Sequence, residues 1–296
     1  MKGVININKP GDWTSQDICA KLRGRLHIKR IGHTGTLDPM ATGVLPVCID
    51  KATRIIEYYD ADKKRYRACM KLGIRTDTLD ITGEVLETAA YTGISEEDVI
   101  EAFKAYRGRI SQVPPKYSAL KIGGRRAYEL AREGKDFEIK TREIEIFSNE
   151  ILRLDIEHGE IEFDVSCSKG TYIRTICDDI GRALGCGAVM TALERTESGY
   201  FKLENAVDIE ELCSMSDEEI ARHVIPMDLT LERLGVVQLD DFRVKAFING
   251  NSTHSNGYRI DAESEFNNSY KVYNASEFLG IARVDRGELK PEKILV

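Results

Sequence analysis

The sequence predicts a mixed α/β protein that ends in a small all-β module. Residues 65–72 and 142–167 alternate apolar with polar side chains, which is typical of strands that have one buried face. A hydroxyl residue, Thr14 or Ser15, stands where a helix would begin. From about residue 236 the helical pattern disappears, and aromatic residues stand among short strand-like runs and turns. These aromatic residues are Phe242, Phe247, Tyr258, Phe266, Tyr270, Tyr273 and Phe278.

The first fifty residues predict a strand, a helix, a loop and a second strand. Residues 2–6 form the first strand, which ends at a Lys-Pro-Gly turn. The helix that follows carries apolar side chains on one face. These are Ile18, Leu22 and Leu26. Residues 27–42 have no clean period and contain Gly and Pro, which predicts an ordered functional loop. Residues 43–49 predict a buried strand, and Pro46 within it favours an edge or bulged position.

Further elements are predicted in the middle of the chain. Helices are expected at 95–106, 125–133 and 171–184, and two strands at 142–167. Ser95 and the acidic residues after it form an approximate capping box, while Gly134 and Gly185 stop the second and third helices. Residues 111–124 are too rich in Pro and Gly to form a regular helix or strand, and too basic to be a loop that only connects two elements.

Composition excludes several classes of protein. The chain has 296 residues, 42% hydrophobic and 31% charged, which is typical of a soluble globular protein with one large and one small domain. No apolar run reaches the roughly 20 residues of a membrane span, and the N-terminus lacks the features of a secretory signal. The seven cysteines are widely spaced without a C-x-x-C pair, which favours buried thiols in a reducing compartment. The five histidines form no metal-binding pattern, so we expect no metal.

Charge is distributed unevenly along the chain. The net charge of −7 by itself argues against nucleic-acid binding. However, residues 21–35 hold five basic residues and no acidic one, and residues 104–135 hold nine basic residues against two acidic ones. Acidic residues gather elsewhere, for example between Asp208 and Glu219. This segregation indicates a surface for a polyanion; the alternative is that the basic clusters lie on separate faces.

The segment from Gly32 to Gly43 is the strongest candidate for chemistry. Its glycines and hydroxyl residues surround Asp38, as expected of a loop that presents a carboxylate to a ligand at close range. The alternative is a simple Asp-Pro turn, because both residues favour turns. A phosphate-binding loop is excluded, because no Gly-Lys-Ser/Thr follows at the required spacing.

Several segments follow one another in the order in which they occur in one known family. They are Asn8–Pro10, Gly32–Gly43, Lys64–Tyr66, Arg75–Asp80, Pro114–Lys121 and Ser168–Arg174. Through them the chain resembles the bacterial TruB-type tRNA pseudouridine-55 synthases, from residue 4 to about residue 200. Residues 278–281 and 291–293 are similar to the C-terminal tail of the family. A single motif of this kind would be weak evidence for the family, whereas several motifs in the family's order are specific evidence for it.

The resemblance implies an isomerisation of the uridine at position 55 in the T-loop of tRNA. The glycosidic bond is cleaved at N1, and the uracil turns and is rejoined through C5. The family uses no cofactor, metal or energy source. The implied architecture is the pseudouridine synthase fold, a largely antiparallel central sheet flanked by helices, followed by a PUA-like module that binds RNA. We expect the catalytic domain at 1–230 with an RNA-gripping insertion at about 108–140, and the module at 236–296.

Three residues match the catalytic set of the family. Asp38 matches the nucleophile, and a carboxylate suits this role because it is ionised at neutral pH. Arg174 matches the arginine that pairs with this aspartate and favours its charged form. Tyr66 matches the tyrosine that stacks on the target uracil and is a candidate base. Without the resemblance, the local pattern would favour a surface position for Arg174 and a packing role for Tyr66.

Further residues match substrate contacts of the family. His33 matches a residue that fills the space left in the T-loop when the base is extruded. Lys9 belongs to the first motif, Asp80 matches a polar residue near the flipped nucleotide, and Tyr172 and Leu193 match positions that line the same pocket. The basic run 21–30 and the insertion are expected to lie along RNA phosphates. The cations of the insertion are Lys116, Lys121, Arg125 and Arg126.

Two departures and two alternative functions accompany this interpretation. Family members often carry more basic residues after the position of Leu193, so one phosphate contact is expected to be absent. The module is short for a full PUA domain and nearly balanced in charge, which predicts a modest contribution to affinity. One alternative is a non-catalytic tRNA-binding or tRNA-folding protein, and a remote one is a hydrolase that uses Asp38. We expect a cytoplasmic monomer that needs no obligate protein partner.

Overall fold

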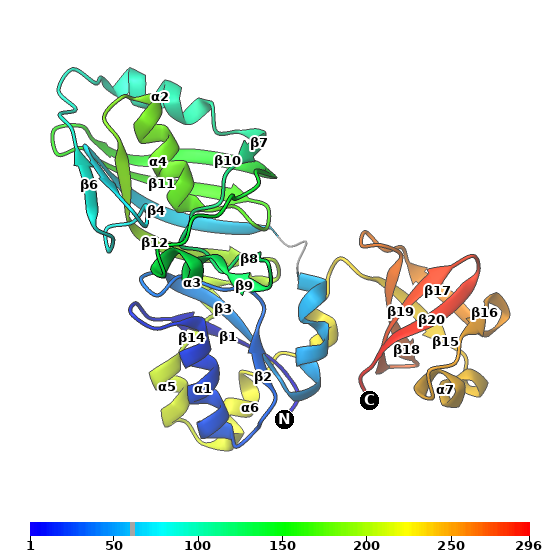
Figure 1. Cartoon of the computed structure of the whole chain (residues 1–296). Helices are drawn as coiled ribbons and strands as arrows, with labels where there is room; N and C mark the ends of the chain where they lie inside the picture. Colours follow the sequence, from blue (N-terminus) through cyan, green and yellow to red (C-terminus); the bar gives the residue numbers. More distant parts are fainter. Residues whose placement is uncertain (60–62) are drawn as a thin grey trace. The chain divides into compact units, whose positions relative to one another are not determined.

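A computed structural model describes residues 1–59 and 63–296 (Figure 1). The described residues form two compact units. The first unit combines residues 1–38, 44–59 and 200–296, and the second combines residues 39–43 and 63–199. The chain therefore passes from the first unit to the second and back within the segment that carries the Gly32–Gly43 motif.

An antiparallel sheet forms the centre of the second unit. Its strands are β4 (Lys64–Leu72), β7 (Gly108–Gln112), β10 (Arg142–Asp155), β11 (Glu160–Cys167) and β12 (Ala188–Ser198). The strand order is β12-β4-β11-β10-β7, and every neighbouring pair is antiparallel. The alternation predicted for residues 65–72 is confirmed, because Tyr66, Ala68, Met70 and Leu72 are buried.

Two helices pack on this sheet. They are α2 (Glu96–Lys104) and α4 (Ile173–Ala183). Helix α2 contacts β10 and α4, while α4 contacts β12 and β4. The predicted capping box of α2 is present, because the Ser95 hydroxyl accepts a hydrogen bond from the Asp98 amide, and the Asp98 carboxylate accepts one from the Ser95 amide. The rings of Phe103 and Phe163 meet edge to face at 5.2 Å and join α2 to β11.

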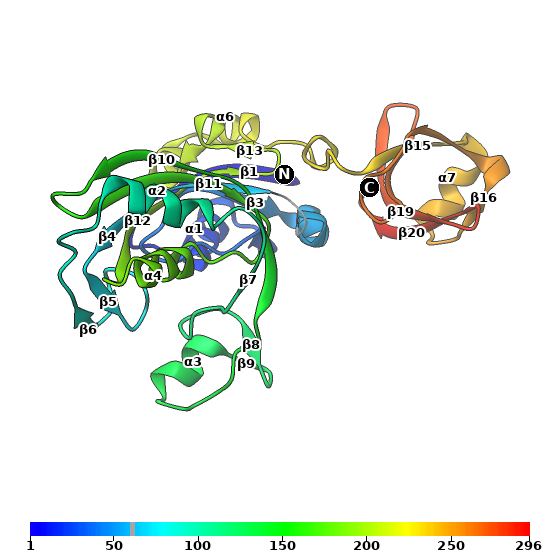
Figure 2. The ribbon, with the colours of Figure 1, turned by 90° about the horizontal axis from the view of Figure 1, so that it is seen from above.

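The insertion extends away from the sheet beyond β7 and contains two short strands and a helix (Figure 2). They are β8 (Lys121–Ile122), β9 (Arg125–Arg126) and α3 (Ala127–Arg132). The helix predicted over 125–133 is therefore shorter than expected. Arg125 and Arg126 pair instead with β8 across a Gly-Gly turn, which a helix starting at residue 125 would not allow. A second hairpin in this unit joins β5 (Ile74–Thr76) to β6 (Val85–Thr88).

The first unit contains the strand, helix and second strand predicted for the first fifty residues, but residues 27–42, which were expected to form a loop, also include a short strand. Its strands are β1 (Gly3–Lys9), β2 (Ile31–His33), residues 44–49 of β3 (Thr42–Ile49), β13 (Phe201–Lys202) and β14 (Val207–Asp208). Its helices here are α1 (Ser15–Leu26), α5 (Ile209–Ser214), α6 (Asp217–Arg222) and the 3₁₀ segments η1 (Asp50–Tyr59), η2 (Leu203–Asn205) and η3 (Met227–Thr230). The edge position expected for β3 is wrong, because β1 and β2 both pair with it. Pro46 fits there because its carbonyl, which proline retains, accepts the Thr34 amide at 3.1 Å.

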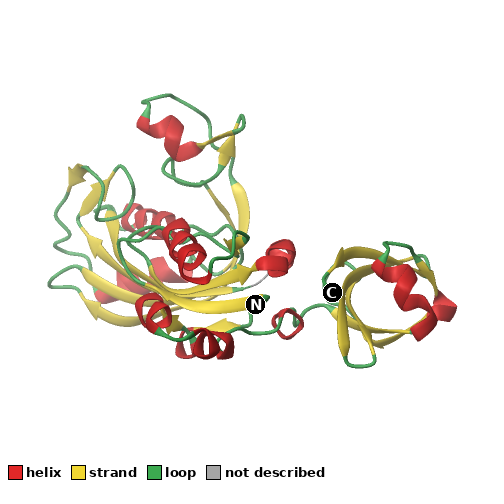
Figure 3. Ribbon diagram, turned by 90° about the horizontal axis from the view of Figure 1, so that it is seen from below, coloured by secondary structure: helices red, strands yellow, loops and turns green. Residues whose placement is uncertain are grey.

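The C-terminal part of the first unit is a six-stranded module that curves into a half-barrel (Figure 3). It contains β15 (Gly235–Leu239), β16 (Thr253–His254), β17 (Tyr258–Ala262), β18 (Ser269–Asn274), β19 (Glu277–Asp285), β20 (Glu288–Ile294) and η4 (Ser255–Gly257). It also contains helix α7 (Asp241–Ile248), which the sequence interpretation did not foresee. This helix is short, and it buries Phe247 in the module's core while Phe242 stays 67% exposed, so it has almost no clean apolar stripe.

The cysteines pack as the composition suggests. All seven are free thiols in the described residues, and five are buried. Burial raises the pKa of Cys19 and of Cys167 to about 11, so both stay neutral at physiological pH. The prediction of small buried hydrophobic residues is confirmed for these five positions.

Candidate functional site

Asp38 lies in the first unit, in the segment between β2 and β3, and is half-buried. Its neighbour Leu37 is 3% exposed, and both its amide and its carbonyl are hydrogen-bonded to the first residue of α1. The Leu37 amide donates to the Ser15 hydroxyl at 2.9 Å, and this hydroxyl donates to the Leu37 carbonyl at 3.2 Å. The backbone next to the candidate nucleophile is therefore fixed by the first turn of a helix rather than being a free turn.

Tyr66 and Leu193 lie on adjacent strands of the second unit, and each is 8% exposed. In the register of β4 and β12, Tyr66 is opposite Arg195 and Leu193 is opposite Ala68. Because side chains two residues apart share a face, Tyr66 and Leu193 are diagonal neighbours on one face of the sheet. The structure brings these two predicted pocket residues together.

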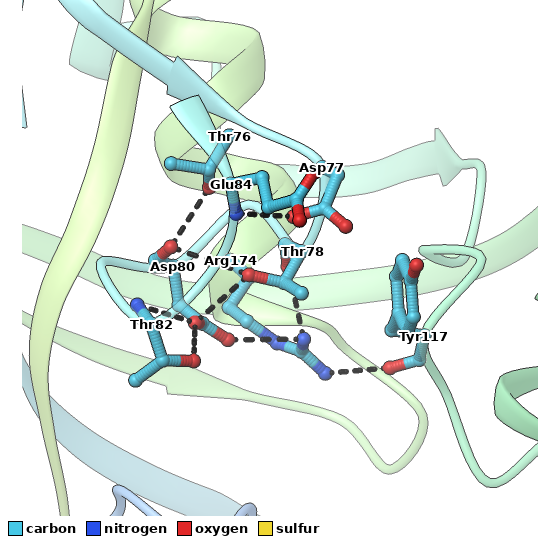
Figure 4. Close-up of polar contacts among 8 residues, drawn as sticks. All are labelled: Thr76, Asp77, Thr78, Asp80, Thr82, Glu84, Tyr117 and Arg174. Carbon is cyan, nitrogen blue, oxygen red and sulfur yellow. Dashed lines mark hydrogen bonds and ion pairs between the residues drawn. The ribbon is translucent and has the colours of Figure 1, made fainter. Parts of the chain in front are cut away.

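Arg174 and Asp80 form a buried ion pair in the second unit (Figure 4). Both side chains are 6% exposed, and the Arg174 guanidinium is 3.2 Å from the Asp80 carboxylate. The guanidinium also donates to the Thr78 carbonyl and the Tyr117 carbonyl, each at 3.0 Å. The guanidinium of Arg174 thus links helix α4 to the loop after β5 and to the insertion. The expected pairing of Arg174 with Asp38 stays a prediction.

The second carboxylate oxygen of Asp80 is held by neighbouring threonines. It accepts the Thr78 hydroxyl at 2.9 Å, the Thr82 amide at 3.1 Å and the Thr82 hydroxyl at 2.5 Å (Figure 4). The hydroxyl of Thr76 donates to the Asp80 carbonyl at 2.7 Å. With donors on both oxygens, this carboxylate has one orientation, as a group that contacts a substrate requires.

The loop that carries Asp80 has a strained backbone. Leu79 adopts a φ of +64°, a left-handed conformation that costs a residue other than glycine about 1–3 kcal/mol. The loop is held there by β12, since the Met190 amide donates to the Leu79 carbonyl at 3.2 Å and the Ile81 amide donates to the Met190 carbonyl at 2.9 Å. Strain that persists in this way is typical of functional sites.

Two residues of this region were not singled out from the sequence. Gln112 is 3% exposed, and its amide group binds both the amide and the carbonyl of Tyr172, at 2.8 and 3.1 Å. It therefore ties the base of the insertion to the residue that caps α4. Arg195 is fully buried, and its backbone pairs with that of Gly43. A Cβ at residue 43 would lie 2.3 Å from the Arg195 carbonyl oxygen, which explains why the motif ends in glycine.

Lys9 and His33 both lie in the first unit. Lys9 is fully buried, and its ammonium donates to the carbonyls of Pro10 and Trp13, each at 2.7 Å. It thus stabilises the turn between β1 and α1. His33 is half-buried, and its Nε2 lies 3.3 Å from the Gln16 side-chain nitrogen. Contacts of these two residues with a substrate stay predictions.

The chain matches one protein family along most of its length. The model of the TruB family pseudouridylate synthase N-terminal domain matches residues 23–173, and that of the tRNA pseudouridylate synthase B C-terminal domain matches residues 174–232. The chain belongs to the TruB family. It is therefore an isomerase, and the resemblance noted from its motifs is confirmed.

Named relatives and solved structures agree with the TruB assignment. tRNA pseudouridine synthase B of Clostridium tetani is 40% identical over 100% of both chains, and that of Clostridium perfringens is 43% identical over 100% of this chain and 99% of its own. A Cbf5–Nop10–Gar1 complex has a chain with a TM-score of 0.78 and 26% identity, over 99% of this chain and 85% of its own. A chain in an H/ACA ribonucleoprotein bound to a substrate RNA that contains 2′-deoxyuridine has a TM-score of 0.76 and 25% identity. The match covers 99% of this chain and 85% of that one. The expected pseudouridine synthase fold with its C-terminal module is confirmed.

The basic run 21–30 of this TruB-family chain is largely paired within the first unit. Lys21 lies 2.9 Å from Glu210, Arg25 lies 2.8 Å from Asp217, and Arg30 is paired with Asp50. Glu210 and Asp217 belong to the acidic residues that gather elsewhere in the sequence, and folding brings them to two of these cations. The basic charge available here is smaller than the sequence suggests.

The cations of the TruB-family insertion differ in their pairing. Arg125 forms an ion pair with Glu133, and Arg126 donates to the Ala119 carbonyl at 2.5 Å. Lys116 and Lys121 are exposed, and neither forms an ion pair with another residue of the described ranges 1–59 and 63–296. These two lysines are the best placed of the four to bind a polyanion.

Neither a metal-binding cluster nor a membrane-spanning helix occurs in the part of the TruB-family chain that the structure describes. Within residues 1–59 and 63–296 there is no group of three or more His, Cys, Asp or Glu side chains that could hold a metal ion. In the same ranges no helix is both long and apolar enough to span a bilayer.

Proposed function

We propose that this enzyme converts the uridine at position 55 in the T-loop of tRNA to pseudouridine. Membership of the TruB family supports the reaction class, and the curated relatives are named for their action on tRNA. The observation that carries the proposal is the buried pair of Asp80 and Arg174, fixed beside the sheet that bears Tyr66. A protein that only binds RNA has no need for a desolvated, fully oriented ion pair at this place.

The proposed reaction is a balanced isomerisation. The bond between C1′ of the ribose and N1 of uracil breaks, and a bond between C1′ and C5 forms. N1 gains a proton and C5 loses one, so neither an oxidant nor an energy source is consumed. Asp38 is the proposed nucleophile, with attack at C1′, attack at C6 and formation of a glycal as three routes that a carboxylate supports.

The target base must leave its stack before it reacts. Tyr66 is proposed to stack on the extruded uracil, which is worth about 1–3 kcal/mol and offsets much of the unstacking cost. Leu193 and Tyr172 would line the pocket, and Asp80 would contact the nucleotide. His33 would fill the space that the base leaves in the T-loop. Arg174 would hold Asp80, and it is proposed to pair with Asp38 and favour the charged form of that carboxylate.

The remaining features of the proposal concern organisation and partners. We propose that residues 1–230 form the catalytic domain, with an insertion at about 108–140 that grips RNA, and that residues 236–296 form the PUA-like RNA-binding module. The protein is proposed to act in the cytoplasm as a monomer on the T-arm of tRNA, without an obligate protein partner. The half-barrel of six strands supports the assignment of the module.

Release of tritium tests the proposed reaction directly. A T-arm stem-loop labelled with tritium at C5 of the target uridine would be incubated with the full chain. Formation of the C1′–C5 bond displaces the C5 hydrogen, so we expect tritium in water in proportion to pseudouridine. A stem-loop with cytidine at position 55 is the matched substrate control. Tight binding of the labelled RNA without release would favour the non-catalytic alternative.

Replacement of Tyr66 by phenylalanine separates stacking from proton transfer. Tyr66→Phe keeps the ring, so we expect KM to stay within about threefold of the wild-type value, and kcat to fall about 10²- to 10⁴-fold if the hydroxyl acts as the base. Steady-state tritium release measures both constants, and Tyr200→Phe, at an exposed position, is the control. An unchanged kcat would limit Tyr66 to stacking.

Removal of the two exposed lysines of the insertion should weaken the salt dependence of RNA binding. For Lys116→Ala with Lys121→Ala, we expect the slope of log K against log salt to fall by about 1 for each lysine that contacts a phosphate. Lys104→Ala is the control, because Lys104 lies 2.8 Å from Glu101 on α2. Filter binding of the stem-loop at several salt concentrations gives the slopes, and equal slopes for all three proteins would contradict the assignment.

A further inference from the structure

Helix α4 carries a second ion pair, in which the buried Asp178 meets the half-buried Arg75. Asp178 stands four residues after Arg174, so the two side chains leave the helix on the same face, one turn apart. The Asp178 side chain is 3% exposed, and its carboxylate lies 3.1 Å from the guanidinium of Arg75. The other carboxylate oxygen lies 2.8 Å from Arg182, a residue that is mostly exposed. The proposed reaction assigns no chemical step to this second pair.

Arg75 is held along its whole length. Its guanidinium lies between Asp178 on α4 and Glu87 on β6, at 3.1 Å from each. Its aliphatic stem crosses Gly187, where a Cβ would lie 2.4 Å from the Arg75 Cγ. Gly187 also has a φ of +72°, so a side chain there would be both strained and obstructive. The Arg75 side chain is thus held in place by contacts with Asp178, Glu87 and Gly187.

The chain leads directly from Arg75 to Asp80. The next residue, Thr76, is 2% exposed, and its hydroxyl donates to the Asp80 carbonyl at 2.7 Å. Five residues after Arg75, Asp80 meets Arg174 on the same helix. The segment 75–80 is therefore bound to α4 by an ion pair at each end, and both pairs use the same helix face. A change at one end of this short segment alters the position of the other end.

We propose that Arg75 and Asp178 are positioning residues, whose ion pair sets the register of the segment 75–80 on α4 and so places Asp80 for the reaction. This inference rests on the proposed function, because it assigns a purpose to the pair of Asp80 and Arg174. Neither residue touches the nucleotide; both act through Asp80. Arg182 shares the Asp178 carboxylate, but its side chain is 57% exposed and its ion pair joins α4 only to itself. It has no positioning role.

The test compares Arg75→Gln with Arg182→Gln in the full chain, with the tritium-labelled T-arm stem-loop as substrate. Both variants remove one guanidinium from Asp178. For Arg75→Gln we expect kcat to fall at least about tenfold while KM stays within twofold, because a small displacement of a group at the reaction is costly to the rate. For Arg182→Gln we expect both constants within twofold of the wild type. Arg75→Lys, which can still reach Asp178, should recover most of kcat.

A double variant distinguishes positioning from general stability. In an Asp80→Asn background, measured at single turnover with enzyme in excess, Arg75→Gln should lower the rate less than twofold further, because the group that it positions is already lost. A full additional tenfold loss would overturn the proposal, as would equal kcat values for Arg75→Gln and Arg182→Gln. If thermal melting shows that Arg75→Gln does not fold, Asp178→Asn takes its place under the same criteria. An inactive wild-type protein would contradict the proposed function, whereas an active one with an unaffected Arg75→Gln contradicts only the positioning role.

Discussion

Replacing Asp38 by asparagine is expected to abolish pseudouridine formation. The amide has nearly the same shape as the carboxylate but lacks its charge and its nucleophilicity, so turnover should fall by about four powers of ten or more, as when other enzymes lose a nucleophile. RNA binding uses other groups, and we expect the Kd for the stem-loop to change by no more than roughly tenfold, about 1.4 kcal/mol. Tritium release and filter binding measure the two quantities separately.

A matched aspartate controls for nonspecific effects of the Asp38 change. Asp12 is exposed and has a φ of +64°, a conformation that asparagine adopts readily, so Asp12→Asn should leave both turnover and binding unchanged. The Asp38 variant should still fold, because the hydrogen bonds of the Ser15 hydroxyl to the Leu37 amide and carbonyl, which hold the neighbouring backbone, are unchanged. Near-normal turnover of Asp38→Asn in a folded protein would make the nucleophile assignment wrong.

Replacing Arg174 by methionine is expected to lower both stability and activity. The Asp80 carboxylate would be left in a site where both side chains are 6% exposed, and removal of one partner of a buried pair costs about 3–5 kcal/mol. The Tyr117 and Thr78 carbonyls would also lose their donor. We expect turnover to fall about a hundredfold or more, since the loop, the insertion and α4 lose their common contact. Urea unfolding gives the stability, and tritium release gives the rate.

The double variant Arg174→Met with Asp80→Asn shows how much of the stability loss is due to the stranded charge. Neither residue is then charged. The double variant should therefore recover a large part of the free energy of unfolding that Arg174→Met alone loses relative to the wild type. Activity should not return, because the oriented carboxylate is still missing. Equal stability of the single and double variants would mean that the fold tolerates an unpaired Asp80, and that the pair contributes little to it.

Local patterns in the sequence were sufficient for most of the secondary structure. The period of two in β4, and the capping boxes of α1 and α2, involve residues within a few positions of one another. Helix α7 could not be predicted from such patterns because it is short and lacks a clean apolar stripe. The length of α3 was overestimated because Arg125 and Arg126 satisfy their backbone groups in a hairpin with β8, a pairing that helix propensity does not register.

The family and the residues proposed to carry the chemistry can be read from the chain without its fold, because motif order and the identity of Asp38, Tyr66 and Arg174 are properties of the sequence. Which charges meet, in contrast, depends on how the chain folds. Arg174 meets Asp80, which is 94 positions away, and Lys21 meets Glu210, which is 189 positions away. Coulomb energy depends on distance in space and on burial, and neither can be calculated from separation along the chain. For the same reason three of the five cations in the basic run 21–30 are paired in the folded chain, whereas the ion pairs on α4 could not be read from the sequence.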